Sequence, residues 1–430
     1  MKQKSLQQHT PRAALATVFL AVLIDLMGFG IILPLLPFYA SVFGATAVQV
    51  GLLYSVYSFA QLIFSPIWGG LSDRFGRRPI MLMSTLGASI AYLVFGLAHT
   101  LGLLFISRLI AGIMGGNIST AQAYVTDVTT HEDRAKGMGL IGAAFGIGFV
   151  IGPAIGTLLI HPKFLELLNI VPRNEFALPG FFAASLSFIS FLLVLFKLPE
   201  TVKKKGMPPS SPPPIEMGGG LRWGVSIFTK TFWQFIIDMG KKSFFPLLLL
   251  SVFLITFAQA SLYSSFPLFC KDRIHLSAEH VGMLFVYMGL IAIIIQGGLI
   301  RFLTRKFSEE KLFLVGSVMM VIGLALIPFA PSLNGLFLIL GIMSIGGSLN
   351  GPTLNSLVSK EADPGKVGAT MGTSQGIAAL ARVIGPTWGG FLYEIGFLLP
   401  FFLTACFLSL TVFVGLKLNQ HLRHTTQTTV

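Results

Sequence analysis

Long apolar stretches alternate with short polar ones along the whole chain, and the apolar stretches define the predicted elements. A helix that spans a bilayer needs about 20 predominantly apolar residues, and twelve segments meet this requirement, six on either side of a polar interval. The predicted helices cover residues 13–40, 48–71, 79–98, 101–127, 137–160 and 178–197, then 246–270, 280–303, 311–331, 334–358, 367–393 and 396–417.

This grouping predicts an all-α integral membrane protein with twelve transmembrane helices in two six-helix bundles. The first bundle covers residues 1–197, the second covers residues 246–418, and a tail follows at 419–430. The interval 198–245 is rich in Lys, Pro, Ser and Gly, which is typical of a linker. Its second part has the composition of an interfacial helix. A lipid-binding role and a simple tether are both open for it.

The charge distribution predicts how the chain lies in the membrane. The 430 residues are 53% hydrophobic and 11% charged, with 30 Lys and Arg against 17 Asp and Glu. Of those 30 basic residues, 24 lie in segments on the side of both termini and four on the other side. Because Lys and Arg concentrate in cytoplasmic loops, we expect both termini to be cytoplasmic. The basic excess then reflects topology in a cell or inner membrane, and we expect no nucleic acid partner.

The composition also argues against several kinds of site. The two cysteines cannot form a disulfide framework, and no Cys or His spacing fits a metal. No Ser/His/Asp arrangement and no carboxylate pair lies in a predicted span. We therefore expect no enzymatic activity, no cofactor and no metal. We further expect a monomer in the lipid bilayer whose partner is a small molecule.

The two halves repeat a pattern of glycines and prolines in the fifth and eleventh helices. Such internal repeats are expected of transporters whose site lies between pseudo-symmetric bundles. Glycines four residues apart let helix backbones approach closely, and a proline bends a helix. Sealing of one side of a moving protein and plain packing are both open explanations. The residues are Gly139, Gly148, Gly152, Pro153 and Gly156 in the first half and Gly372, Gly385, Pro386 and Gly389 in the second.

Five motifs in order carry a resemblance to a known family. The connection between the second and third helices reads Gly69-Gly70-Leu71-Ser72-Asp73-Arg74-Phe75-Gly76-Arg77-Arg78 and resembles the signature loop of the major facilitator superfamily. The other four are Gly28-Phe29-Gly30 with Pro34 and Pro37, Arg108 with Ala111-Gly112 and Gly115, the fifth-helix glycines, and Leu198-Pro199-Glu200-Thr201. Together they resemble the twelve-helix drug/proton antiporters, nearest to the tetracycline-resistance type. The resemblance implies the major facilitator fold.

Three ionisable residues lie deep in predicted spans, where charge is costly and usually functional. Asp25 in the first helix and Arg108 in the fourth lie at matching depths, about 20 Å from the inner surface at 1.5 Å per residue. We expect Asp25 to bind the coupling proton, with Arg108 stabilising its ionised form, a pairing that the resemblance also implies. The alternative is a static ion pair between the two helices.

Arg382 in the eleventh helix has no second deep carboxylate to pair with. One interpretation places it in the central cavity, where it attracts an anionic substrate group or the ionised Asp25. In the other, it caps carbonyls freed at the Gly385-Pro386 break or extends toward lipid headgroups.

The signature loop predicts a latch at the inner surface. We expect Asp73 near a positive helix N terminus, that of the eleventh helix, and Arg77 or Arg78 near Asp127. The resemblance implies that this network closes the inner side in the outward-facing state. A purely topogenic basic loop is the alternative. The predicted latch residues are Gly69, Asp73, Arg74, Gly76, Arg77, Arg78, Asp127 and Arg134.

Polar residues within the spans are candidates for lining a cavity, although hydrogen bonds between helices explain many such residues equally well. They are Tyr57, Gln61, Asn117, Gln122, Gln259, Tyr263, Gln296, Asn350 and Gln375.

The sequence thus predicts a proton-coupled antiporter that exports amphipathic small molecules by alternating access. A proton-coupled symporter or exporter of an anionic metabolite or lipid-like molecule is the alternative, and a non-transporting membrane sensor is a remote one.

Overall fold

The computed structural model describes residues 11–129, 134–167, 176–201, 244–362 and 367–428, and these ranges contain helices and short connections without strands. All twelve predicted spans are helical. Most of the predicted linker, residues 202–243, lies outside the described residues. The last helix continues to Thr428, so the predicted tail is in large part its helical continuation.

The first half contains six spans, two of which are broken. The first span bends at residues 33–35, where Pro34 cannot donate a backbone hydrogen bond. The fourth span breaks at Gly115 and Gly116. The helices are α1 (Pro11–Ile32), α2 (Leu36–Val42), α3 (Ala47–Phe75), α4 (Arg77–Gly96), α5 (Leu101–Met114), α6 (Asn117–Val128), α7 (Arg134–Leu159), α8 (Pro162–Leu167) and α9 (Ala177–Lys197).

The second half contains the other six spans. The eighth span of the chain includes a π-helical turn, η1, between two α-helical pieces. The elements are α12 (Phe245–Arg273), α13 (Ala278–Ile294), η1 (Ile295–Leu299), α14 (Ile300–Lys306), α15 (Glu309–Leu326), a 3₁₀ turn (Ile327–Phe329), α16 (Leu333–Lys360), α17 (Val367–Ile395) and α18 (Leu399–Thr428).

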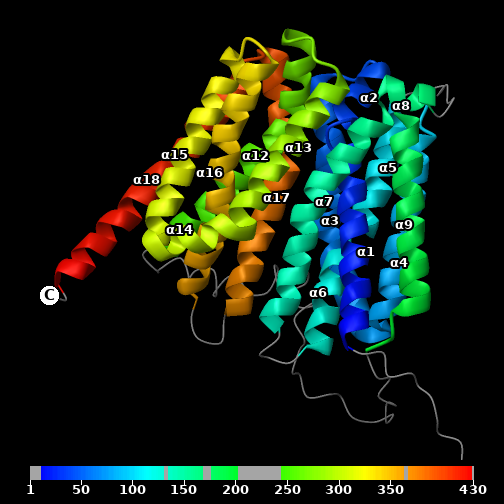
Figure 1. Ribbon diagram of the computed structural model, residues 1–430, viewed down its shortest axis with the longest axis horizontal. Coiled ribbons are helices and arrows are strands. Elements are labelled where there is room, and N and C mark those ends of the chain that lie inside the picture. The colour runs from blue at the N-terminus through cyan, green and yellow to red at the C-terminus, as the bar shows by residue number, and fades with distance from the viewer. Residues whose placement is uncertain (1–10, 130–133, 168–175, 202–243, 363–366, 429–430) are drawn as a thin grey trace, which may run out of the picture.

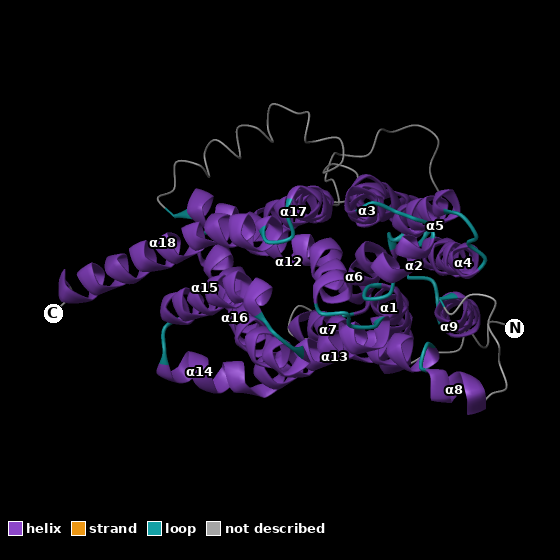
Figure 2. Cartoon of the chain, turned by 90° about the horizontal axis from the view of Figure 1, so that it is seen from above, coloured by secondary structure: helices purple, strands orange, loops and turns teal. Residues whose placement is uncertain are grey.

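The two halves stand side by side as two bundles (Figure 1). Viewed along the helices, α3 lies beside α17 and α7 lies beside α13, and these pairs form the main seams between the bundles (Figure 2). Of the described helices, eleven are long and apolar enough to cross a membrane. The twelfth span, α17, is less apolar and is packed between α12 and α3.

Polar contacts join the bundles near one end. We call the end that carries the α3–α4 connection the basic end, and the end that carries the N terminus of α3 the far end. Near the far end, Ser55 and Thr387 share a hydrogen bond of 2.7 Å across one seam. Across the other seam, His161 Nε2 lies 3.3 Å from Glu279 Oε1. The structure is therefore closed at its far end.

The repeated glycines pack mainly within their own bundles. Gly148, Gly152 and Gly156 face α1, where an ideal Cβ on Gly152 would lie 2.7 Å from the Met27 carbonyl oxygen. Gly385 and Gly389 face α12 in the same way, while Gly139 has open space around it. The close approach predicted from the spacing is present, and it joins α7 to α1. A sealing role for these glycines stays a prediction.

Candidate functional site

Asp25 lies in the middle of α1 and is partly exposed. Among the described residues, its carboxylate has no hydrogen bond or ion pair. One turn later, Gly28 contacts the ring of Tyr92 in α4, because an ideal Cβ on Gly28 would lie 2.7 Å from that ring. The carboxylate is thus available to protons or ligands that enter between the helices.

Arg108 in α5 is 3% exposed, and aromatic rings hold its guanidinium group. The Cζ atom lies 5.1 Å from the ring centroid of Phe95 and 5.9 Å from that of Tyr92. Nη2 donates a 3.1 Å hydrogen bond to Ser107 Oγ, and Nε has no partner within the described part of the chain. Cation–π contacts of this kind are worth roughly 2 kcal/mol where water is excluded. In this structure Arg108 and Asp25 therefore do not form the static ion pair that the sequence left open.

Tyr57 in α3 interacts with all three intramembrane charges. Its hydroxyl accepts a 3.4 Å hydrogen bond from Gln61 Nε2, and its ring centroid lies 5.2 Å from that of Phe29. It is close enough to interact electrostatically with Asp25, Arg108 and Arg382. The sequence singled out these charges from depth alone, and the fold gathers them around one tyrosine.

Tyr92 interacts electrostatically with both Asp25 and Arg108, and the sequence did not single it out. A tyrosine in an apolar helix carries no distinctive pattern. The one usable signal was Gly28, whose missing side chain leaves room for the ring.

Arg382 in α17 extends toward the first bundle. It is partly exposed and lies in electrostatic range of Tyr263 and Tyr57. The Tyr263 ring centroid is 6.1 Å from that of Tyr54. This geometry favours the cavity interpretation over contact with headgroups.

The remaining polar candidates divide by exposure. Gln259 and Gln296 extend toward α16, since ideal Cβ atoms on Gly347 and Gly351 would lie 3.4 Å and 3.9 Å from their amide nitrogens. Asn117 is 1% exposed, and neither polar atom of its amide has a hydrogen-bond partner in the ranges that the structure describes. The exposed candidates are Gln122, Gln259, Gln296 and Gln375.

Asn350 is not a cavity residue, and that prediction was wrong. It is completely buried between α15 and α16. Its amide lies 3.4 Å from Ser317 Oγ, and in the alternative amide orientation it donates to the Phe313 carbonyl at 3.0 Å. A buried amide that is satisfied by a neighbouring helix serves packing, and sequence alone does not distinguish the two cases.

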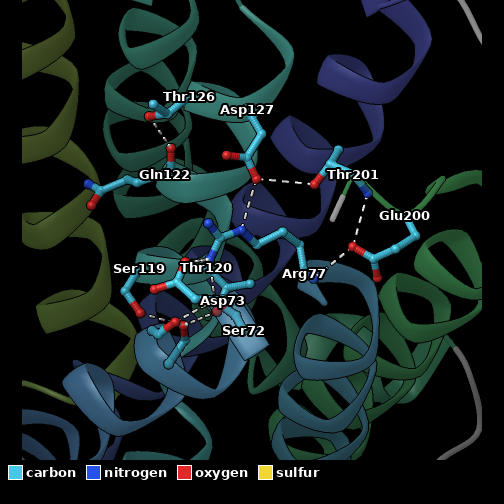
Figure 3. A network of polar contacts seen from close by, with 12 residues as sticks. Ser72, Asp73, Arg77, Ser119, Thr120, Gln122, Thr126, Asp127, Glu200 and Thr201 are labelled. Atoms are coloured by element: carbon cyan, nitrogen blue, oxygen red, sulfur yellow. Dashed lines mark hydrogen bonds and ion pairs between the residues drawn. The ribbon is translucent and has the colours of Figure 1, made fainter. Parts of the chain in front are cut away.

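At the basic end, the buried guanidinium of Arg77 joins three polar groups (Figure 3). Nη1 lies 2.5 Å from Asp73 Oδ1 and donates a 2.6 Å hydrogen bond to Ser72 Oγ. Nε donates to Asp127 Oδ2 at 2.9 Å. Arg77 thereby connects the end of α3, the start of α4 and the end of α6.

Other predicted latch residues contribute less to this cluster. Arg78 donates to the Leu195 carbonyl at 2.6 Å, and Arg74 is exposed with its Cζ 5.4 Å from the Phe75 ring centroid. Gly69 has open space instead of a close helix contact. The side chain of Arg134 lies outside the described residues. Asp73 pairs with Arg77 in this structure, so its expected docking at the eleventh helix is not seen here.

Glu200 caps the start of α4 and was not predicted as a site residue. Its carboxylate accepts backbone hydrogen bonds from Arg77 at 2.9 Å and Arg78 at 3.1 Å. Gly76, at φ +108°, lies directly against this carboxylate, where a Cβ would not fit. Thr201 Oγ1 adds a 3.1 Å hydrogen bond to Asp127 Oδ2. The Leu198-Pro199-Glu200-Thr201 motif thus has a structural role, because it connects the start of α4 to the end of α6.

Replacing Glu200 by Ala is expected to destabilise this end of the first bundle by about 1 kcal/mol, the usual cost of losing a helix cap. Glu200→Gln should lose less, because the amide oxygen still accepts one of the two hydrogen bonds. The thermal midpoint of the purified protein in detergent measures the effect. Equal midpoints for Glu200→Ala and the parent would contradict the capping role.

The chain is similar in sequence to a large family of known proteins. The family model described as Major Facilitator Superfamily matches residues 18–386 and 299–427. Tetracycline resistance protein, class C, from Escherichia coli is 29% identical over 406 residues, covering 89% of this chain and 93% of that protein. Major facilitator superfamily domain-containing protein 10 from Homo sapiens is 30% identical over 441 residues, covering 92% and 93%.

Solved structures are similar as well. The human organic anion transporter MFSD10 (TETRAN) has a TM-score of 0.67 at 27% identity, covering 95% of this chain and 100% of that one. A bacterial homolog of the human lysosomal transporter Spinster has a TM-score of 0.73 at 15% identity, covering 94% and 96%, and supports the fold alone.

Proposed function

Because this chain belongs to the major facilitator superfamily, it is a membrane transporter of small molecules, and we propose that it exports amphipathic compounds in exchange for protons. In this proposal it acts as a monomer in a cell or inner membrane, with the basic end and both termini in the cytoplasm. The multidrug and tetracycline resistance proteins among its relatives support export of drug-like compounds.

The observation that carries the proposal is the arrangement of Asp25, Tyr92 and Arg108. Asp25 is partly exposed and has no ion-pair partner among the described residues, whereas Arg108 is buried as a fixed positive charge. Both interact with Tyr92. Enclosing a carboxyl group in a closed, water-poor state costs less free energy when the group is protonated and neutral. Protonation of Asp25 is therefore suited to controlling the conformational change in which the bundles close around it.

In this proposal the closed far end is one state of an alternating-access cycle. With the basic end in the cytoplasm, that state is inward-facing and receives substrate from inside. In the outward-facing state the basic end closes, and Asp73 is then free to exchange its contact with Arg77 for the N terminus of α17. Until the bundles approach each other at the basic end, Arg77 holds the Asp73 carboxylate in place.

Flux in vesicles tests this function. Purified protein is reconstituted into liposomes with an imposed pH gradient and supplied with cationic, neutral and anionic amphipathic compounds. Movement of a compound against the direction of proton flow supports antiport. Movement in the same direction as protons would select a symporter, and the absence of flux for all three classes would overturn the transport proposal.

A second candidate, export of organic anions, is favoured by the charges around Tyr57. Two arginines and one carboxylate lie in its electrostatic range, so the site carries one net positive charge when all three are ionised. The human relative MFSD10 is titled an organic anion transporter. An anionic substrate group would balance this charge near Arg382.

Arg382→Ala separates the two candidates. If the substrate is anionic, the variant is expected to lose about tenfold in affinity, the equivalent of one charge-assisted hydrogen bond. A cationic substrate should bind the variant as well as the parent or better. Binding of a fluorescent anion and a fluorescent cation to the purified protein, with Arg382→Lys as the charge-preserving control, measures the difference.

A further inference from the structure

α3 and α17 run antiparallel along their seam. Val48 contacts Glu394, and seven residues later in α3 and earlier in α17, Ser55 contacts Thr387. Both helices have 29 residues, or about 43 Å at 1.5 Å per residue. Close backbone contacts, of Gly51 with Pro386 and of Ala47 with Gly390, are offset from this pairing by about five residues. Continued along both helices, the register therefore takes Asp73 to the start of α17 at Val367.

This register gives the two helices matching ends. Glu394 stands one residue before the end of α17, and its carboxylate contacts Val48, the second residue of α3. Asp73 stands two residues before the end of α3, and the register places it level with the start of α17. Each helix thus carries a carboxylate at its C-terminal end, opposite the N-terminal turn of the other helix.

The contact of Glu394 is formed in this structure. Its Oε1 accepts a 2.8 Å hydrogen bond from the backbone N–H of Val48, in the other bundle. The N terminus of α3 is otherwise capped by its own residues, because Thr46 and Gln49 form a reciprocal pair of hydrogen bonds. The helix therefore does not need Glu394 in order to form, and the Val48 N–H is available to the other bundle.

The far end of α17 is fixed to its own bundle. Tyr393 donates a 3.0 Å hydrogen bond to Asp272 Oδ2 of α12, and Arg273 Cζ lies 3.8 Å from the Phe397 ring centroid. Gly390, one turn before Glu394, lies against the backbone of Ala47. Glu394 must therefore move with the second bundle, and separation of the bundles at the far end breaks its hydrogen bond.

We propose that Glu394 is the gating residue of the far end, and that with Asp73 it forms a reciprocal pair of latches. This inference rests on the alternating access of the proposed function. Glu394 on the N terminus of α3 holds the far end closed, and Asp73 on the N terminus of α17 holds the basic end closed. Each carboxylate is released as the other engages, so transport proceeds between two capped states.

Thiol labelling of the seam tests this pair. Ser55 is 6% exposed at the closed seam and becomes accessible when the far end opens. In a background of Cys270→Ser and Cys406→Ser, Ser55→Cys is labelled with a membrane-impermeant maleimide added from the far side. Glu394→Gln is expected to raise the labelling rate by about threefold to tenfold, because the bond is solvent-exposed and the amide oxygen can still accept it, without the charge that roughly doubles its strength. Asp73→Asn is expected to lower it.

The matched control is Asp272→Asn, which removes a carboxylate at the same end of the same bundle while its contact stays within that bundle. Its labelling should equal that of the parent. If Glu394→Gln also labels at the parental rate while Asp73→Asn lowers it, the latch role of Glu394 is overturned and alternating access stands. If the thiol introduced by Ser55→Cys is not labelled in any variant, opening of this seam fails, and with it both proposals.

A spin-label distance distribution across the far end gives a second measurement. It does not depend on the reactivity of a buried thiol. A longer mean distance in Glu394→Gln than in Asp272→Asn supports the latch, and identical distributions contradict it. If transport in vesicles is not coupled to protons while Glu394→Gln still raises the labelling rate, the proposed antiport is refuted and the latch stands.

Discussion

Asp25→Asn is expected to abolish transport driven by a pH gradient. The amide has nearly the shape of the carboxyl group but does not bind or release a proton, so it cannot couple proton flow to the movement of the bundles. Removing the charge also removes its cost within the bilayer, about 2.5–3.5 kcal/mol on insertion scales. The variant should therefore insert normally, and liposome flux with and without a pH gradient measures the loss.

Exchange of labelled substrate at equal pH on both sides provides the control. It needs the substrate site and the movement of the bundles, and we expect Asp25→Asn to retain it. Asp25→Glu, which keeps a titrating group one methylene farther from α1, should retain part of the driven transport. Undiminished gradient-driven transport by Asp25→Asn would show that the coupling proton binds elsewhere.

Arg77→Ala should be the most damaging change at the basic end. The side chain is 9% exposed, and its removal leaves Asp73, Asp127 and Ser72 without their common partner. Hydrogen bonds to charged groups are worth about 1.5–3 kcal/mol each, and exposure of the two carboxylates reduces this value. We expect a loss of about 2 kcal/mol in stability and at least about tenfold in transport rate, measured by thermal unfolding and vesicle flux.

Arg77→Lys distinguishes charge from geometry. Lysine keeps the positive charge but lacks the planar group that donates to Asp73 and Asp127 at once. It should recover part of the stability and less of the transport. A neighbouring arginine, Arg74, is exposed and stacks on Phe75, so Arg74→Ala should leave stability unchanged. Equal effects of the Arg74 and Arg77 variants would reduce the loop to a topological signal.

The fold could be predicted from hydropathy because bilayer thickness fixes the length of every span. The internal breaks were harder. Pro34, Gly115 and Gly116 lie inside continuous apolar stretches. A proline or glycine in such a stretch bends some helices and leaves others unbroken, so its presence alone does not predict a break. The π-helical turn at residues 295–299 carries no recognisable pattern either.

The site was predictable where charge was rare. Asp25, Arg108 and Arg382 stood out because ionisable residues are costly in a bilayer. Tyr92, Glu200 and Glu394 did not, because their roles depend on partners in distant segments: Glu394 and Val48 are 346 residues apart. Asn350 shows the opposite error, since an amide between two helices has the same sequence pattern as an amide in a cavity.

The packing of α17 against α3 has a consequence for biosynthesis. This helix contacts α3 and α12, both of which leave the ribosome earlier, since α3 ends at Phe75 and α17 begins only at Val367. Until α17 arrives, the face of α3 that carries Gly51 and Ser55 lacks its partner. The nascent first bundle must therefore persist with an incomplete surface, and chains truncated before α17 should be substrates for membrane quality-control proteases.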